Sequence, residues 1–168
     1  MGKHAEMVAK IEKRISRLPG QPGLCLHIAH HVCSVLHLYD QYAVIQAGSL
    51  QWPRLRPEDD DGQVDTHFSY MFTPLTPASV LSMAQGNLPE IHCWVGLPDE
   101  QILVDFSVKD LPMAAAKLGM AWTAPPPPKH LWCSARALPA GVVYQPDREA
   151  TLLACRILKR LYNPTWLG

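Results

Sequence analysis

The chain has 168 residues, 48% of them apolar, and its 15 Lys and Arg balance its 15 Asp and Glu. This length and apolar share are sufficient for one compact core, so we expect a single domain over residues 1–168. The absence of net positive charge argues against nucleic-acid binding, and the charged N-terminal segment argues against a membrane span or a secretory signal, so we expect a cytoplasmic protein.

The N-terminal half is predicted to begin with helices and continue with strands. Apolar residues at helical spacing among Lys, Glu and Arg predict an amphipathic helix over 3–17. After a break rich in Pro and Gly, the segment 24–39 contains neither residue and is predicted to be a second helix. Residues 42–52 and 66–72 are rich in β-branched and aromatic residues and are predicted strands.

The C-terminal half is predicted to contain a hairpin followed by helices. A short helix is expected over 76–86, and two strand-like runs, 90–96 and 101–107, are separated by a four-residue turn at 97–100. Further helices are expected over 110–120 and 147–162, with the proline run 125–128 extended between them. This order contains no βαβ repeat, so the pattern favours an α+β fold with N-terminal helices packed on an antiparallel β-sheet.

Cys25 lies in the first turn of the second predicted helix. Free backbone N–H groups and the helix dipole stabilise a negative charge at this position, which lowers the pKa of a thiol and makes Cys25 a candidate nucleophile. Helical projection places Cys25 with the apolar face of the helix, and a buried, unreactive cysteine is the alternative interpretation. The five cysteines stand at positions 25, 33, 93, 133 and 155 without a CxxC pair, which favours free thiols over disulfides or structural zinc.

The predicted hairpin brings His92 and Asp105 onto one face. A turn at 97–100 places these two residues directly opposite each other, with Cβ atoms about 5 Å apart. Side chains alternate along a strand, so Cys93 is expected on the opposite face. A carboxylate beside an imidazole orients the ring and stabilises its charged form, leaving the other ring nitrogen to act on a thiol. The alternative interpretation is an ordinary His-Asp pair that has no catalytic role.

Two segments resemble the transglutaminase-like and papain-like cysteine protease superfamily. GLCLHIAHHV…AVIQAG is similar to that family's cysteine at the start of an apolar helix, followed by a strand that ends in glycine. IHCWVGLPDEQILVD is similar to its second motif, a His followed two residues later by Trp and then by an Asp in the next strand. The resemblance covers roughly residues 20–107 and implies a papain-like or transglutaminase-core fold.

The resemblance implies a catalytic triad of Cys25 as nucleophile, His92 as general base and acid, and Asp105 as orienting residue. It implies chemistry on an amide or acyl carbonyl through a thioester, with a peptide, a protein or a small amide as substrate and no cofactor. Gln21 is a candidate side-chain donor for an oxyanion hole beside the Cys25 N–H. Trp94 shares the face of His92 and is a candidate wall of the site.

Three alternatives stay open at this point. The same fold can serve as a catalytically inactive binding module, with the cysteine and the His-Asp pair as structural residues. His67, on a predicted strand, is a rival base, although no downstream carboxylate is paired with it. The histidines at positions 27, 30, 31 and 37 share one helix face and could present metal ligands, although no carboxylate or CxxC accompanies them.

Overall fold

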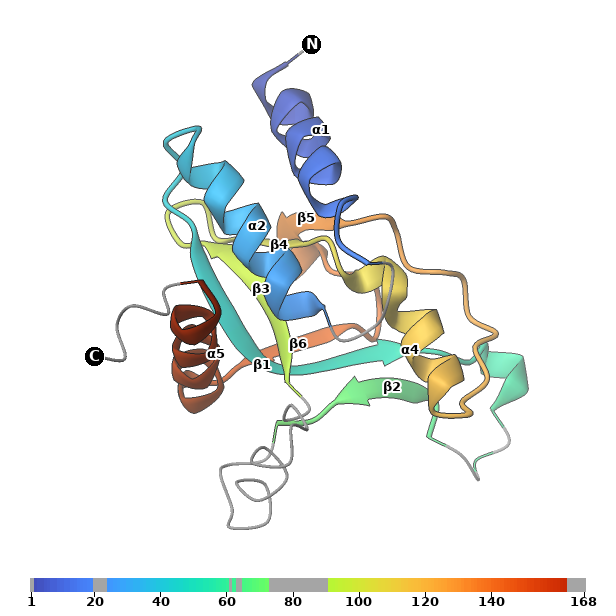
Figure 1. Ribbon diagram of the computed structural model, residues 1–168. Coiled ribbons are helices and arrows are strands. Elements are labelled where there is room, and N and C mark those ends of the chain that lie inside the picture. The colour runs from blue at the N-terminus through green and yellow to red at the C-terminus, as the bar shows by residue number, and fades with distance from the viewer. Residues whose placement is uncertain (1, 20–23, 61, 63–64, 73–90, 163–168) are drawn as a thin grey trace.

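The computed structural model describes residues 2–19, 24–60, 62, 65–72 and 91–162 (Figure 1). Its α-helices are α1 (Lys3–Ile15), α2 (Cys25–His37), α4 (Leu111–Lys117) and α5 (Arg148–Tyr162). Its strands are β1 (Val44–Pro53), β2 (His67–Tyr70), β3 (His92–Leu97), β4 (Ile102–Asp105), β5 (Leu131–Ser134) and β6 (Val143–Pro146). Short 3₁₀ helices occupy Pro57–Asp59, Val108–Asp110 and Ala135–Ala137. The helix predicted over 76–86 lies outside the described residues.

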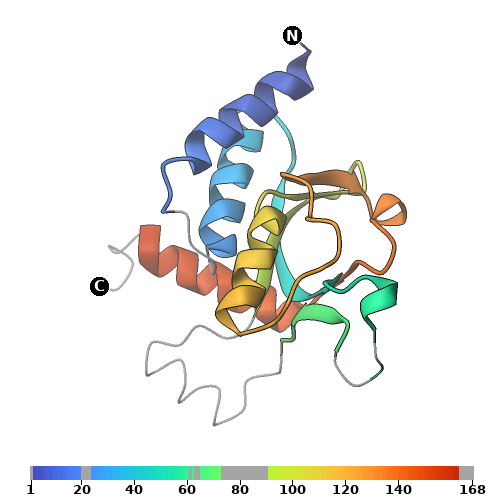
Figure 2. The same cartoon turned by 90° about the vertical axis from the view of Figure 1, so that its right-hand side faces the viewer.

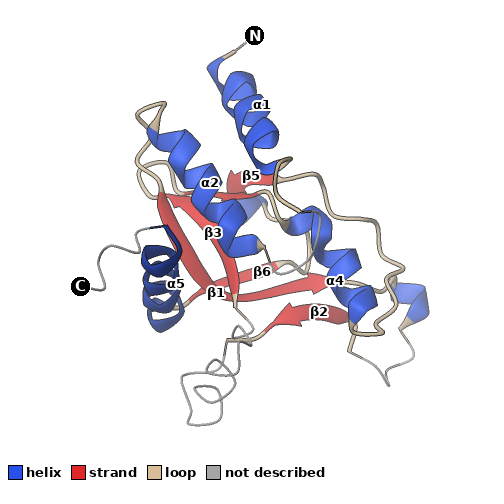
Figure 3. Ribbon diagram, in the orientation of Figure 1, coloured by secondary structure: helices blue, strands red, loops and turns tan. Residues whose placement is uncertain are grey.

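The described strands form one antiparallel sheet in the order β2-β1-β3-β4-β5, and β6 pairs with β1 (Figure 3). β1 is the longest strand and therefore pairs with three others along its length. Together with the helices this arrangement confirms the predicted α+β class. Among the described residues, no helix combines the length and apolarity needed to cross a membrane.

Apolar side chains pack on both faces of the sheet. One core cluster joins α1, α2 and α5 to the face that carries Cys93 and Val95, and a second cluster joins α4 to the face that carries Trp94 (Figures 1 and 2). α2 buries an apolar face, as helical spacing predicts, and its buried residues are Leu26, Ile28, Ala29, Val32, Cys33, Val35 and Leu36. The sheet therefore has a core cluster on each face, and β3 contributes alternate side chains to both.

The register of the β3–β4 hairpin differs from the prediction. Leu97 pairs with Ile102 and Val95 with Val104, so the turn occupies 98–101 rather than 97–100. Leu97 stays in the strand because its side chain is buried in the core, and Gln101 closes the turn with a positive φ of 55°. The predicted direct opposition of His92 and Asp105 is therefore wrong.

The corrected register still leaves the two polar residues on one face. Relative to the prediction, each β3 residue pairs with a β4 residue two positions further along the chain. Side chains alternate between faces with a period of two, so a shift of two positions does not change the face. Continuing the observed pairs places Trp94 opposite Asp105, so His92 lies diagonally across the hairpin from the carboxylate. Diagonal neighbours remain within reach of long or aromatic side chains.

Strands β5 and β6 are missing from the sequence-based prediction. β6 is short and mostly exposed, so it lacks the alternating apolar pattern of a half-buried strand. It approaches β1 closely at Gly48, where an added Cβ would lie 2.1 Å from the backbone oxygen of Gln145. Only glycine allows this approach, which carries Tyr144 toward the face of His92.

Candidate active site

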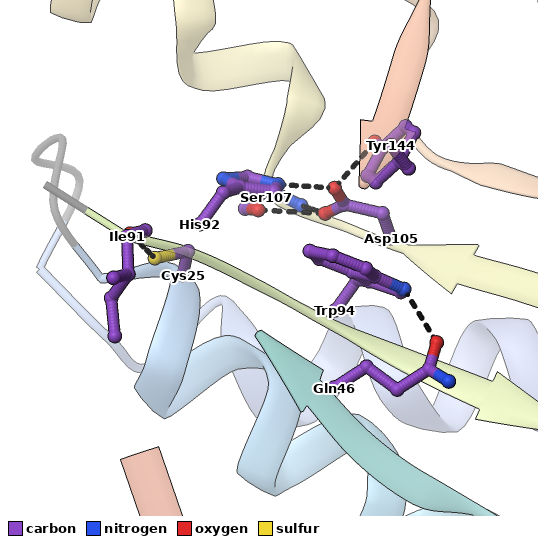
Figure 4. A network of polar contacts seen from close by, with 8 residues as sticks. All are labelled: Cys25, Gln46, Ile91, His92, Trp94, Asp105, Ser107 and Tyr144. Carbon is purple, nitrogen blue, oxygen red and sulfur yellow. Dashed lines mark hydrogen bonds and ion pairs between the residues drawn. The ribbon is translucent and has the colours of Figure 1, made fainter. Parts of the chain in front are cut away.

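Cys25 is the first residue of α2, and its side chain is directed toward the start of β3. The N-cap residue Leu24 provides no side-chain cap, so the first N–H groups of the helix are free of that partner. The Cys25 Sγ lies 3.7 Å from the carbonyl oxygen of Ile91, the residue before His92 (Figure 4). The thiol is half-buried at the junction of helix and sheet.

The Asp105 carboxylate accepts four hydrogen bonds. His92 Nε2 donates to Oδ2 at 2.6 Å, and the Tyr144 hydroxyl donates to the same oxygen at 2.7 Å (Figure 4). Ser107 donates its backbone N–H and its hydroxyl to Oδ1, at 2.7 and 2.6 Å. A carboxylate with this many donors is held in one orientation in its charged form.

Aromatic rings enclose the His-Asp pair. The His92 ring stacks between Tyr70, at a centroid distance of 5.3 Å, and Trp94, at 6.1 Å, and Tyr144 lies 5.9 Å away. Only 1% of His92 and 2% of Asp105 remain exposed. The hydrogen bond between them is therefore shielded from water, which strengthens its electrostatic part.

The electrostatics favour a charged imidazole and a charged carboxylate. Burial opposes the charged form of His92, but the charge and hydrogen bond of Asp105, together with Cys25, raise the pKa of His92 to about 10. Burial likewise opposes the Asp105 carboxylate, but the charge and hydrogen bond of His92 and the hydrogen bonds of Ser107 lower the pKa of Asp105 below its ordinary value. Each member of the pair stabilises the charge of the other.

The pKa of Cys25 is held well below its ordinary value. The neighbouring Cys93 thiol is the largest cause, burial acts in the opposite direction, and the nearby His92 side chain with its charge lowers the pKa further. His92 Nδ1 is buried and has no hydrogen-bond partner among the described residues. Since Nε2 is occupied by Asp105, Nδ1 is the ring atom that can exchange a proton with Cys25.

The structure thus brings together Cys25, His92 and Asp105 from α2, β3 and β4. Trp94, the predicted wall residue, stacks on His92, and its Nε1 donates to Gln46 Oε1 at 2.8 Å. Gln21, the predicted oxyanion donor, lies outside the described residues. Cys25 is the first residue of α2, so its backbone N–H has no hydrogen-bond partner within the helix.

Sequence reasoning missed three contacts of the triad. Tyr144 had no signal, because β6 lacks a strand-like pattern. Ser107 carried a weak signal, since a serine two residues after an aspartate can bond back to the carboxylate. Cys93 was expected to face away from His92, which it does, but the same alternation directs it toward α2 and Cys25.

The remaining candidate residues have other partners. His27 Nδ1 lies 2.8 Å from the Tyr162 hydroxyl, and His30 stacks on the Tyr162 ring at 4.1 Å, so this helix face packs against the end of α5. Within the described ranges, no group of three or more His, Cys, Asp or Glu side chains is arranged to hold a metal ion. His67, the rival base, is the first residue of β2, and its Nδ1 lies 3.0 Å from the hydroxyl of the preceding Thr66.

Comparison with known proteins gives information on the fold alone. No family model matches the chain, and no curated protein matches it. A crystal structure described only as that of a genomics target superposes with a TM-score of 0.51 at 14% identity, covering 98% of this chain and 73% of that one. At this identity the similarity shows a shared fold and carries no function to this chain.

Proposed function

We propose that this chain is a cysteine-nucleophile hydrolase or acyltransferase of the peptidase or amidase type, built on a papain-like or transglutaminase-like core. The observation that carries the proposal is the His92 ring, which bonds Asp105 through Nε2 at 2.6 Å while its buried Nδ1 has no partner among the described residues. A ring oriented in this way beside a thiol of lowered pKa is the arrangement that nucleophilic catalysis requires.

The proposed reaction starts from a Cys25 thiolate and a His92 imidazolium. The sulfur attacks an amide or acyl carbonyl, and the oxygen charge is stabilised by the backbone N–H of Cys25. His92 Nδ1 gives its proton to the leaving amine or alcohol, which leaves a thioester on Cys25. Water or an amine then attacks the thioester and loses its proton to His92, and Asp105 stabilises the ring charge throughout.

A recess beside the start of α2 is the proposed substrate site. It has a volume of about 270 Å³ and is lined by Leu24, which precedes the nucleophile, and by Ile28, Lys109, Asp110 and the end of α1. Cys25 and His92 are not among its lining residues, so a substrate seated here would extend past Leu24 to reach the Cys25 sulfur. The mixed lining suits an uncharged amide or acyl segment of a peptide.

A catalytically inactive binding module is the competing function. The observation in its favour is that His92 and Asp105 are 1% and 2% exposed, as expected of a polar pair that stabilises a core. In that case the lowered thiol pKa would have no consequence for reactivity. Thiol chemistry distinguishes the two functions without knowledge of a substrate.

The test is the pH dependence of iodoacetamide labelling of the full chain, read at each cysteine by mass spectrometry. We expect Cys25 to react about tenfold faster than the other cysteines below about pH 7. In His92→Gln, which keeps a polar side chain without its charge, the labelling of Cys25 should move to higher pH. Cys33→Ala is the matched control, because Cys33 lies on the same helix with its pKa raised to about 11, chiefly by burial.

The activity itself is tested with fluorogenic amide and ester substrates of neutral peptides. We expect turnover that is lost in Cys25→Ala and retained in Cys33→Ala, with an acyl adduct trapped on Cys25 at early times. Labelling of Cys25 that is slow below pH 7 and unaffected by His92→Gln would refute the proposal and favour the binding module.

A further inference from the structure

A second thiol stands beside the candidate nucleophile. Ile91 and Cys93 are two residues apart and share the sheet face that packs on α2, where both belong to one core cluster. Cys25 packs against the same cluster, and its sulfur contacts the backbone of Ile91 at 3.7 Å. Cys93 is 1% exposed, so its thiol is enclosed within this cluster.

The two thiols differ in their readiness to ionise. Interaction with Cys93 is the largest cause of the lowered pKa of Cys25, and interaction with Cys25 is the largest cause that raises the pKa of Cys93 well above its ordinary value. Of the two thiols, Cys25 is therefore the one that ionises more readily.

We propose that Cys25 and Cys93 form a peroxide-sensitive dithiol, in which Cys25 is oxidised first and Cys93 resolves the product as an intramolecular disulfide. The ligand class is a hydroperoxide, with hydrogen peroxide as the smallest member. The carrying observation is geometric: the Cys25 sulfur contacts the Ile91 carbonyl oxygen at 3.7 Å, and Cys93, two residues further along the same face of the sheet, is 1% exposed in the core cluster against which Cys25 packs.

The chemistry balances in two steps. The Cys25 thiolate attacks one peroxide oxygen, the O–O bond breaks, and the products are a sulfenic acid on Cys25 and an alkoxide or hydroxide that takes up a proton. The Cys93 sulfur then attacks the Cys25 sulfur, an S–S bond forms, and the hydroxyl leaves with the Cys93 proton as water. In sum, one hydroperoxide is reduced to an alcohol or water, and two thiols are oxidised to one disulfide and one water.

The disulfide would block the Cys25 sulfur and protect it from further oxidation. Without a resolving thiol, a sulfenic acid advances irreversibly to a sulfinic acid, whereas a disulfide is restored by thiol reductants. The inference uses the same Cys25 thiolate as the proposed function but no acyl substrate. If the chain shows no acyl transfer, the inference of a peroxide-sensitive dithiol is therefore unaffected.

Cys33 provides an internal comparison on the same helix. It lies eight residues after Cys25, about 12 Å along the helix axis, and its sulfur donates to the carbonyl oxygen of Ala43 at 3.4 Å. Its pKa is raised to about 11, by burial first and by Cys155 second. Cys33 should therefore stay reduced under conditions that oxidise Cys25.

The experiment treats the full chain with one equivalent of hydrogen peroxide, blocks free thiols with N-ethylmaleimide, and maps tryptic peptides without reduction. Trypsin leaves Cys25 and Cys33 on one peptide, so the experiment is repeated on a Cys33→Ala background to assign the link. Parallel samples contain dimedone, which traps sulfenic acid. Cys93→Ala and Cys93→Val remove the resolving thiol, the second with a side chain of closer volume in case the first weakens the core.

We expect a Cys25–Cys93 crosslink that dithiothreitol reverses, with little dimedone adduct. In either Cys93 variant we expect the crosslink to disappear and the dimedone adduct on Cys25 to become the main product, formed more slowly because Cys93 no longer lowers the Cys25 pKa. A dimedone adduct on Cys25 in the unchanged chain without the crosslink, or a crosslink to another cysteine, would overturn the inference. If iodoacetamide labels Cys25 at low pH while peroxide gives no crosslink, the dithiol fails and the proposed function survives.

Discussion

Replacement of Cys25 by alanine should make the stability of the fold depend on pH in a way that the unchanged chain does not. In the unfolded chain, His92 and Cys25 titrate at their ordinary values of 6.5 and 9.0. In the folded chain, despite burial, Asp105 and Cys25 raise the pKa of His92 to about 10, whereas Cys93 and His92 lower that of Cys25. The folded pair therefore carries its one proton on His92, and the unfolded pair carries it on Cys25.

Whether the free energy of unfolding rises or falls with pH depends on the number of protons bound in the folded and the unfolded state. Between pH 6.5 and 9.0 the unchanged pair binds one proton whether folded or unfolded, so it contributes no slope to the free energy of unfolding. In Cys25→Ala, the folded chain keeps the His92 proton, while the unfolded chain releases it above pH 6.5. The stabilisation is thus complete below pH 6.5 and is lost as the pH rises toward the folded pKa.

One extra proton in the folded state lowers the free energy of unfolding by roughly 1.4 kcal/mol for each pH unit. The Asp105 charge and hydrogen bond remain in the variant, but the contribution of Cys25 to the His92 pKa is lost. We therefore expect a loss of about 2 kcal/mol between pH 6.5 and pH 9 relative to the unchanged chain.

The assay is urea unfolding followed by tryptophan fluorescence from about pH 6 to pH 9, reported as the difference between variant and unchanged chain. Cys33→Ala should show no such slope, because its thiol is protonated in both states below pH 9.0. The double variant Cys25→Ala/His92→Gln should remove the slope again. Parallel profiles for Cys25→Ala and the unchanged chain would refute the idea that Asp105 holds His92 in its charged form.

Two further substitutions test the surroundings of the triad. Tyr144→Phe removes the hydroxyl that donates to the buried Asp105 at 2.7 Å, and should lower the free energy of urea unfolding by roughly 1–3 kcal/mol; an unchanged midpoint would show that Asp105 does not need this donor. Gly48→Ala places a Cβ 2.1 Å from the Gln145 oxygen and should cost about 1–3 kcal/mol through displacement of β6, while Leu152→Ala, on a side chain 49% exposed, should stay within about 0.5 kcal/mol.

Local periodicity was sufficient to predict the elements that carry the triad. The helix that begins at Cys25 follows from a run without Gly or Pro after a Pro/Gly break, and the positions of its buried face follow from helical spacing. His92 and Asp105 share a face because strand alternation depends only on the parity of the register. The error in the turn changed the pairing by an even number, so it moved His92 to a diagonal position without moving it to the other face.

The face on which a residue lies within the hairpin or along one helix is set by a few neighbouring residues, and the sequence by itself determined it, although it did not determine the register of the turn. Tertiary structure alone decided what encloses the pair: Tyr144 reaches Asp105 from 39 residues downstream, through a strand with no pattern of its own. The tertiary structure likewise decided that Cys25 packs against the core cluster that contains Cys93, because this depends on how α2 packs on β3. Such contacts join distant segments, and their formation rests on loop closure and core packing, which no local spacing records.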